Sequence, residues 1–250
     1  MIIGITGSRG FVGSGLARRA AGDGHVIRYL DRPVFSLEHG MDDAWLDGAG
    51  MLIHCAHDFQ DHEKNIEGSE KLFRQARRLG VGTVVFMSSL SVDADSDYGR
   101  AKKKIESIAG GLGVRIIRPG LIYEQAPGGL LGRIIRVARF TPVLPTIRNS
   151  EQYTTHIEDL YRAVMAAPAA RGVIMAASEQ PVKLETIIAR FAGNRMFVPI
   201  PFPFLYRVLG ILESIHLSFG LRADNLLGLH HLAEPGFGES RRLGLKFREF

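Results

Sequence analysis

Short apolar segments alternate with longer segments of mixed polarity along the first half of the chain. Nearly every position in the apolar segments is hydrophobic, which predicts buried strands at residues 2–6, 25–30, 51–56, 83–87 and 114–117. Between them, apolar residues recur with helical spacing, which predicts helices at residues 11–21, 61–79 and 98–109. This alternation is typical of an α/β fold in which helices cover both faces of a parallel sheet. The right-handed crossover rule then favours a Rossmann-type doubly wound sheet.

The pattern becomes irregular after Pro119. We expect a loop-rich stretch there, because turn-forming residues interrupt it at Gly128, Gly129, Pro142 and Pro145. A helix is expected at residues 157–167, and the apolar run from Phe204 to Leu217 also has a helical pattern. Packing within a lobe or an interface explains that run most simply, and an interfacial helix that grips a membrane or a lipid-linked substrate is the alternative.

The domain organisation follows from the absence of a linker between the regular and the irregular parts. We expect one Rossmann-type domain over residues 1–250. Within it, residues from about 120–150 and 175–250 are expected to form a small C-terminal lobe on the substrate side.

Composition and charge narrow the class of protein. The chain is 46% hydrophobic and 23% charged, which is ordinary for a globular protein. Its net charge of +5 is scattered and accompanies no nucleic-acid-binding module, so we expect no nucleic acid partner. No apolar run reaches the ~18 residues of a membrane span. The single cysteine, Cys55, and the lack of a signal peptide favour the cytoplasm, and the sequence is compatible with a homodimer.

A glycine-rich loop joins the first predicted strand to the first predicted helix. Gly7 permits a tight turn, Gly10 lets a pyrophosphate approach the backbone, and Gly13 lets the helix pack on the strand. The free N–H groups at the helix start can then bind phosphates. We therefore expect a dinucleotide here, with contacts from Gly7, Arg9, Gly10, Phe11, Val12 and Gly13.

Residues at the end of the second predicted strand bear on which dinucleotide is bound. Asp31 is suited to bond the adenosine ribose hydroxyls and would repel a 2′-phosphate, which favours NAD. Arg9 and Arg32 lie where a 2′-phosphate would need cations, which favours NADP. The choice between NAD and NADP stays open, with NAD favoured.

Candidate redox chemistry lies after the fourth strand. Tyr98 and Lys102 are one helical turn apart on a predicted helix, and Ser89 follows the strand. We expect the Lys102 ammonium to lower the pKa of Tyr98, so that the phenol exchanges a proton with a substrate hydroxyl or carbonyl. Ser89 would donate a hydrogen bond to the substrate oxygen as hydride moves.

Several motifs together resemble the extended short-chain dehydrogenase/reductase superfamily, in its NAD-dependent epimerase/dehydratase group. These motifs span most of residues 1–167: TGSRGFVG at 6–13, LIHCAH at 52–57, FMSSLSV at 86–92, YGRAK at 98–102, IRPGLIY at 117–123 and THIEDL at 155–160.

The resemblance implies a role for each matching residue. Ser89 corresponds to the catalytic Ser/Thr, Tyr98 to the acid/base, and Lys102 to its partner, which also holds the nicotinamide ribose. Ala56 would line the cofactor cleft, and Pro119 would pass close to the nicotinamide. The implied substrate is a nucleotide-sugar, either epimerised at C4 or reduced from a 4-keto form.

The chain also departs from the family pattern, which bears on the substrate more than on the cofactor. Only nine positions separate Ser89 from Tyr98, and Asp93-Ala94 replaces the usual Tyr-Gly. His57 stands where alanine is usual. His54, His57 and His62 could suggest a metal, but their spacing has no convincing acidic partner, so we expect none. His57 could instead line the cleft.

Two other functions remain as alternatives. One is a reductase of another small carbonyl compound. The other is a non-catalytic NAD(P)-binding sensor or assembly subunit, although such a protein would not need Ser89, Tyr98 and Lys102.

Overall fold

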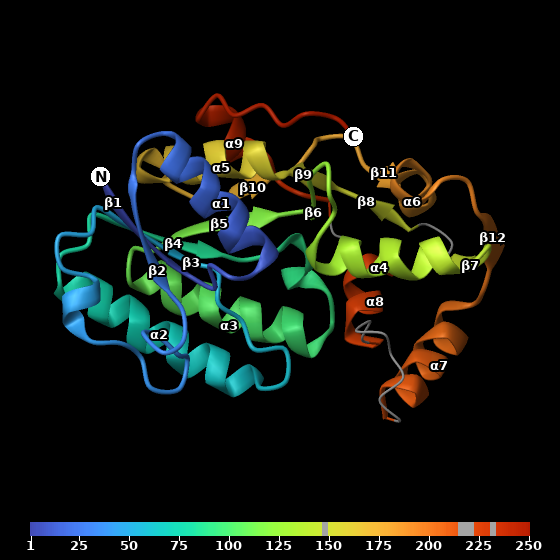
Figure 1. The fold of residues 1–250 in the computed structure, drawn as a ribbon, viewed down its shortest axis with the longest axis horizontal. Coiled ribbons are helices and arrows are strands. Elements are labelled where there is room, and N and C mark those ends of the chain that lie inside the picture. The colour runs from blue at the N-terminus through green and yellow to red at the C-terminus, as the bar shows by residue number, and fades with distance from the viewer. Residues whose placement is uncertain (147–149, 215–222, 231–233) are drawn as a thin grey trace.

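The computed structural model describes residues 1–146, 150–214, 223–230 and 234–250. Its centre is a six-stranded parallel sheet with the strand order β10-β5-β4-β3-β1-β2 (Figure 1). The strands are β1 (Ile2–Thr6), β2 (Val26–Leu30), β3 (Met51–His54), β4 (Thr83–Met87), β5 (Arg115–Pro119) and β10 (Ile174–Ala176). From β1 the chain first runs to β2 at one edge and then crosses to β3, so the topological switch point lies between β1 and β3. The predicted Rossmann-type doubly wound sheet is confirmed.

The sheet is buried on both faces, which explains why its strands are almost wholly apolar. Alternate residues of one strand enter different cores: Val85 packs with α1 and α5, whereas Phe86 packs with α2 and α3. Figure 1 shows the two pairs of helices on opposite sides of the sheet. The helices are α1 (Phe11–Gly22), α2 (His62–Arg78), α3 (Asp97–Gly111) and α5 (Ile157–Ala166).

Side chains cap two of these helices and fix where they begin. The Asp61 carboxylate accepts a hydrogen bond from the Lys64 N–H at 2.9 Å and starts α2. The Ser96 hydroxyl accepts one from the Gly99 N–H at 2.9 Å and starts α3. All four helices expected from the periodicity are present, with ends that shift by one or two residues.

The prediction of a loop-rich stretch after Pro119 is wrong in part, because this stretch contains helix α4 (Gly129–Phe140). Leu131, Ile135 and Ala138 recur on one face of α4 and are buried. The glycine pair stands at the start of the helix and Pro142 follows its end, so these residues bound a helix instead of interrupting one.

Helix α4 belongs to a second group of elements at one end of the sheet (Figure 1). A third core, which includes Ile135 and Ile187, joins α4 to α6 (Leu184–Ala192). Three two-stranded sheets pair β6 (Leu121–Tyr123) with β9 (Thr154–His156), β7 (Val143–Thr146) with β12 (Met196–Pro199), and β8 (Glu151–Gln152) with β11 (Val182–Lys183). The remaining helical elements are α7 (Phe202–Ser214), α8 (Ala223–His230), α9 (Gly238–Arg242), η1 (Asp43–Trp45), η2 (Leu90–Asp93) and η3 (Ala167–Ala169).

The apolar run expected to be helical from Phe204 to Leu217 is helical up to Ser214, where α7 ends, and its last residues lie outside the described ones. Phe204 and Ile211 of this helix are 61% and 62% exposed, so α7 is not a core helix. Within the described residues, the helices all lack either the length or the apolar character that a membrane span requires.

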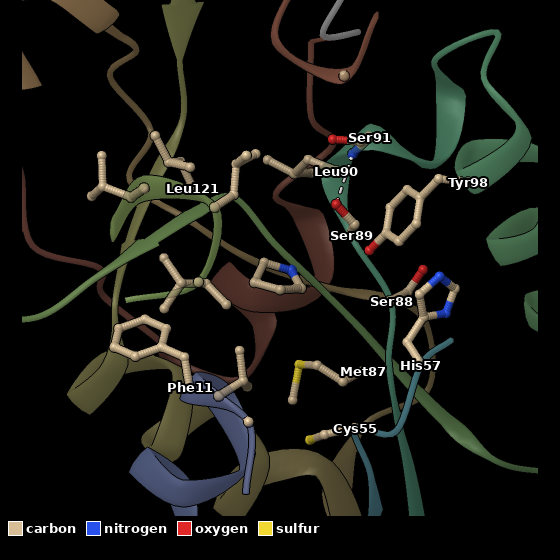
Figure 2. A pocket seen from close by; sticks show the side chains of 18 of the residues that line it. Phe11, Cys55, His57, Met87, Ser88, Ser89, Leu90, Ser91, Tyr98 and Leu121 are labelled. Atoms are coloured by element: carbon tan, nitrogen blue, oxygen red, sulfur yellow. Dashed lines mark hydrogen bonds between the residues drawn. The ribbon is translucent and has the colours of Figure 1, made fainter. Parts of the chain in front are cut away.

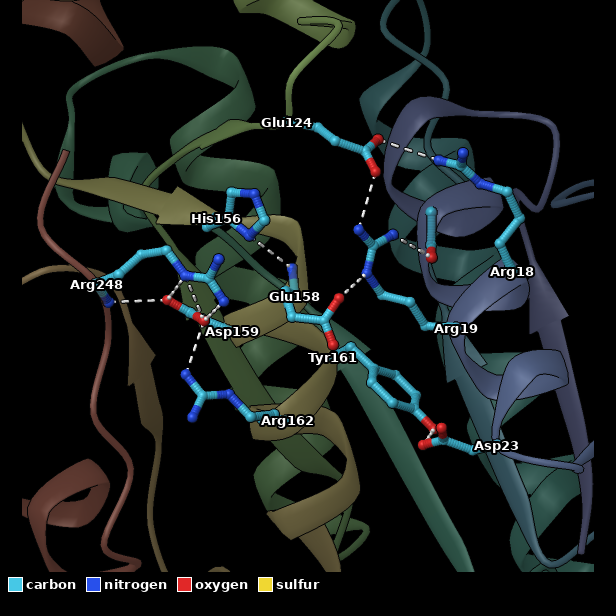
Figure 3. Close-up of polar contacts among 11 residues, drawn as sticks. Arg18, Arg19, Asp23, Glu124, His156, Glu158, Asp159, Tyr161, Arg162 and Arg248 are labelled. Carbon is cyan, nitrogen blue, oxygen red and sulfur yellow. Dashed lines mark hydrogen bonds and ion pairs between the residues drawn. The ribbon is translucent and has the colours of Figure 1, made fainter.

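Ion pairs join segments that are distant in sequence (Figure 3). The Arg19 guanidinium on α1 donates to Glu158 of α5 at 2.7 Å and to Glu124 at 2.8 Å. On the other side of α5, the buried Asp159 carboxylate accepts hydrogen bonds from the Arg248 side chain at 2.7 Å and from its backbone N–H at 2.8 Å. The C-terminal segment is thereby attached to the helix that covers the sheet.

Candidate active site

A cavity of about 470 Å³ lies at the carboxyl ends of the central strands, where a doubly wound sheet binds its ligands (Figure 2). The glycine loop, the ends of β3 and β4, and the start of β6 contribute to its wall. Most of the predicted site residues line this one cavity: Gly7, Gly10, Phe11, Val12, Gly13, Ala56, Ser89, Tyr98, Lys102 and Pro119.

The glycine loop has the conformation that a close backbone approach requires. Gly7 has φ of 68°, a left-handed value that favours glycine, and a Cβ placed there would lie 2.7 Å from the Ala56 backbone nitrogen. Helix α1 begins directly after Gly10, and no side chain caps its first turn. Its N–H groups can therefore receive an anionic group at the cavity. These features fit the phosphates of a dinucleotide.

Asp31 and Arg32, predicted at the end of β2, and Arg9 of the glycine loop lie outside the lining of this cavity. Asp31 accepts a hydrogen bond from the Ser8 N–H at 3.0 Å and a second one from the Ser8 hydroxyl. Arg9 donates to the carbonyl oxygen of Arg32 at 3.2 Å, so the two arginines lie beside each other. Arg32 lines a separate, more open cavity with Ser36 and other residues of the following loop. The acidic and the basic features are thus adjacent at one end of the glycine loop.

The structure brings Ser89, Tyr98 and Lys102 together. The side chains of Ser89 and Tyr98 both line the cavity, and the Ser89 hydroxyl lowers the pKa of the Tyr98 phenol. The Ser89 hydroxyl also accepts a hydrogen bond from the Ser91 N–H at 3.1 Å, which caps η2. The buried Lys102 Nζ donates to the Met87 carbonyl oxygen at 2.8 Å and lies 5.7 Å from the centroid of the Tyr98 ring.

Close packing explains how so few residues can connect Ser89 to Tyr98. After Ser89 the chain turns through η2 and enters α3 almost at once. Gly99 lies directly against this turn, since a Cβ there would be 2.4 Å from the Ala94 carbonyl oxygen. The helix can therefore approach the turn closely enough for Tyr98 to face the end of β4.

Burial affects the pKa values of Tyr98 and Lys102 more than neighbouring charges do. Burial raises the pKa of Tyr98 to about 12, the Asp224 charge adds to the rise, and the Ser89 hydroxyl opposes it. The expectation that Lys102 lowers the pKa of Tyr98 is therefore wrong for this structure. Burial also lowers the pKa of Lys102 to about 8. Tyr98 is a neutral phenol near neutral pH, which is the form that donates a proton.

Helix α8 supplies a contact that the sequence did not reveal. The Asp224 carboxylate accepts hydrogen bonds from the N–H groups of Asp97 at 3.1 Å and Tyr98 at 3.2 Å. A carboxylate at the N-terminus of α3 also interacts favourably with the helix dipole. Asp224 thereby holds the start of the helix that carries Tyr98. It has no motif around it, and only the tertiary fold brings it to this position.

Two further residues of the cavity, Arg133 and Phe59, also escaped prediction. Arg133 of α4 lines the cavity, and its guanidinium lies 5.9 Å from the centroid of the Phe59 ring. The buried Nε of Arg133 has no hydrogen-bond partner among the described residues. A helix hidden in an apparently irregular segment gives no local signal for such a placement.

The histidines have separate roles, and the described residues contain no His, Cys, Asp or Glu cluster arranged to hold a metal ion. His54 is a core residue whose ring nitrogens are hydrogen-bonded to Thr6 Oγ1 at 2.7 Å and Ser69 Oγ at 3.0 Å. His57 lines the cavity, whereas His62 begins α2 outside the lining.

The strand order and the glycine loop define the class of protein by its fold, which is a Rossmann-type doubly wound domain. Solved structures share this fold. MoeE5, in complex with UDP-glucose and NAD, matches with a TM-score of 0.74 and 18% identity over 100% of this chain and 94% of that chain.

Two other solved structures are similar over most of their length. TunA, an NAD-dependent NDP-hexosamine 5,6-dehydratase of tunicamycin biosynthesis, has a TM-score of 0.65 and 21% identity over 90% of this chain and 100% of that chain. The UDP-glucose 4-epimerase of Thermus thermophilus, in complex with NAD, has a TM-score of 0.64 and 19% identity over 80% of this chain and 86% of that chain. The sequence itself matches no protein-family model and no curated protein. At these identities the likeness confirms the predicted resemblance at the level of the fold.

Proposed function

We propose that this protein is an NAD(P)-dependent oxidoreductase or epimerase that acts on a secondary alcohol or ketone of a nucleotide-sugar. The observation that carries the proposal is the convergence of Ser89, Tyr98 and Lys102 in the cavity that the glycine loop also lines. Structural neighbours that carry NAD and a UDP-sugar, or NAD alone, support the cofactor and substrate class. The second group of elements would serve as the substrate lobe.

Each of the three residues has a task that its surroundings support. Tyr98 donates its phenolic proton to a substrate carbonyl oxygen, and takes it back when an alcohol is oxidised. Ser89, which lines the same cavity as Tyr98, donates to the same oxygen where negative charge develops. Lys102 is held at the Met87 carbonyl, from where its ammonium would bind the nicotinamide ribose. The nicotinamide supplies or accepts the hydride when it is bound.

Arg133 supports a substrate that carries an anionic group. Its guanidinium is a permanent cation with a buried, unpartnered Nε in a cavity whose wall is largely apolar. A phosphate group of the substrate would supply the missing acceptor and satisfy the charge. The diphosphate of a nucleotide-sugar has this chemistry.

Titration with NADH and NADPH, followed by turnover assays with UDP-glucose and other nucleotide-sugars, tests the proposal. We expect one dinucleotide to bind and Y98F to lose about 100-fold or more in kcat, because the variant lacks the transferable proton. Tyr29→Phe is the matched control, since Tyr29 is 58% exposed on β2 and should keep full activity. Failure of both dinucleotides to bind, or full turnover by Y98F, would refute the proposal.

A further inference from the structure

Besides Arg133 Nε, two buried polar atoms of residues in the cavity wall have no hydrogen-bond partner among the described residues. They are Nε2 of His57 and the hydroxyl oxygen of Ser88. A buried polar atom that stays unpaired destabilises the fold, so such atoms are normally bonded. Both residues line the cavity, so a ligand that carries hydrogen-bonding groups can supply the missing partners.

The His57 ring is held in place by aromatic neighbours. It packs edge-on against Tyr98, with 5.0 Å between ring centroids, and against Phe59, with 4.8 Å. Figure 2 shows the imidazole on the same side of the cavity as the Tyr98 ring. A ligand group bonded to His57 would therefore lie beside the atom that exchanges a proton with Tyr98.

The surroundings keep the imidazole neutral. Burial is the main cause that lowers the pKa of His57 to about 2, and the Lys102 charge lowers it further. A neutral imidazole has one donor and one acceptor nitrogen, so it can bond a hydroxyl in either sense. It carries no proton to transfer near neutral pH. Its chemistry is therefore that of a fixed hydrogen-bonding group.

The position favours substrate over cofactor as the ligand. His57 packs on Phe59, which stacks on Tyr98 with 6.2 Å between ring centroids and lies under the Arg133 guanidinium. His57 thus belongs to a wall that leads from Tyr98 to the cation proposed to bind the substrate.

We propose that His57 is a specificity residue, whose Nε2 hydrogen-bonds a substrate hydroxyl on a carbon next to the reacting one, with Ser88 as a second contact. The inference rests on the proposed function and adds a requirement to it. Substrates need a hydroxyl group beside the carbon that is oxidised or reduced, and simple ketones or secondary alcohols without one are disfavoured.

Binding of UDP-glucose to the NADH-saturated protein, measured by calorimetry, tests this requirement. H57F keeps an aromatic ring but leaves no hydrogen bond, and we expect it to weaken UDP-glucose binding by about 10-fold. NADH affinity should stay within about twofold. H57Q, which retains a polar group near the Nε2 position, should recover part of the loss. His25→Phe is the matched control, because His25 lies outside the cavity lining, directly before β2, and should leave both affinities unchanged.

The outcomes separate the two proposals. A wild-type protein that binds no UDP-glucose or other nucleotide-sugar would refute the proposed function. A wild-type protein that binds UDP-glucose while H57F binds it equally well would refute the role of His57 alone. Weaker NADH binding by H57F with unchanged UDP-glucose binding would also overturn it, since His57 would then contact the cofactor.

Discussion

Lys102 is subject to opposite demands from stability and from the proposed chemistry. Its side chain is buried, at 4% exposure, and its ammonium bonds one carbonyl oxygen, at 2.8 Å from Met87. No carboxylate among the described residues lies within ion-pair distance of it. Burial of a cation with so few partners favours the neutral form, which is why its pKa falls from 10.5 to about 8. The fold therefore tolerates a destabilising group at the position where the reaction needs one.

We predict that Lys102→Met stabilises the protein near neutral pH while abolishing turnover. A shift from 10.5 to about 8 corresponds to a penalty of about 3 kcal/mol. The penalty is complete below about pH 8 and vanishes above the unfolded pKa, because only the unfolded chain binds the proton between the two values. Urea unfolding at pH 7 should show a gain of about 1–3 kcal/mol, since the lost bond to Met87 offsets part of it.

The gain from K102M should shrink when unfolding is measured near the unfolded pKa of 10.5. Lys103→Met is the matched control, because Lys103 is its neighbour on α3 with a side chain that is 69% exposed. It should change stability by less than about 0.5 kcal/mol. A K102M variant that is less stable than wild type at pH 7 would contradict the burial argument.

At the scale of elements, a helix or strand can be predicted from the sequence when the residues that define it are close together along the chain. The β1 to α1 junction can be predicted because its strand, glycines and helix are consecutive in sequence, and the structure has them at residues 2–22. Helix α4 escapes prediction because Gly128 and Gly129 have the pattern of a loop, whereas in the structure they stand where the helix begins.

The candidate site divides in the same way. Ser89, Tyr98 and Lys102 lie within one strand–turn–helix unit, so their order and spacing are visible in the sequence. Arg133 and Asp224 reach the cavity from elements with no recognisable motif. The ionisation of Tyr98 is also beyond sequence reasoning, because burial depends on elements distant in the chain.

Helix α8 acts on the candidate site through the charge of Asp224. The Asp224 charge raises the pKa of Tyr98, so D224N should lower it while keeping one side-chain oxygen as an acceptor for the N-terminus of α3. Alcohol oxidation requires the ionised phenol, and its pH–rate profile should therefore shift to lower pH. At pH 8 we expect a rise of about two- to fivefold.

Asp95→Asn is the control for the Asp224 variant. Asp95 carries the same charge in the turn before α3, but its side chain is 93% exposed. Solvent screens such a charge, and the profile should not move. An unchanged profile for D224N, or a shift to higher pH, would contradict the assigned role of Asp224.

At the scale of the whole molecule, the C-terminal segment connects the cores. Leu243, Leu245 and Phe247 pack against the core between the sheet and α5. Phe250 packs in the third core, with its ring 5.0 Å from that of Tyr123. Between them, Arg248 bonds Asp159, so one short segment joins the sheet to the group of elements around α4 (Figure 3). Residues from the sheet and from α4 both line the cavity. The C-terminal segment therefore helps to hold the two parts of the cavity wall in place.

We predict that Asp159→Asn destabilises the molecule as a unit. Asp159 is 1% exposed, and without its charge the Arg248 guanidinium loses its ion pair. Because the Arg248 side chain is 46% exposed, solvent offsets part of this loss, and we expect a cost of about 2 kcal/mol, or roughly 4–8 °C in Tm for a chain of this size. Thermal unfolding should remain a single transition at lower temperature. Two separate transitions would mean that the segment does not couple the cores.

The stabilisation by Asp159 should also depend on pH. Burial alone would raise the pKa of Asp159, but the hydrogen bonds from Arg248 and Arg162 outweigh it and hold the pKa below its usual value. The stabilisation is therefore complete above about pH 4 and is lost as the pH falls through the folded pKa. The difference between wild type and D159N should narrow below about pH 4. Arg162→Met removes a partner that is 52% exposed and should cost about 1 kcal/mol or less, which identifies Arg248 as the connecting residue.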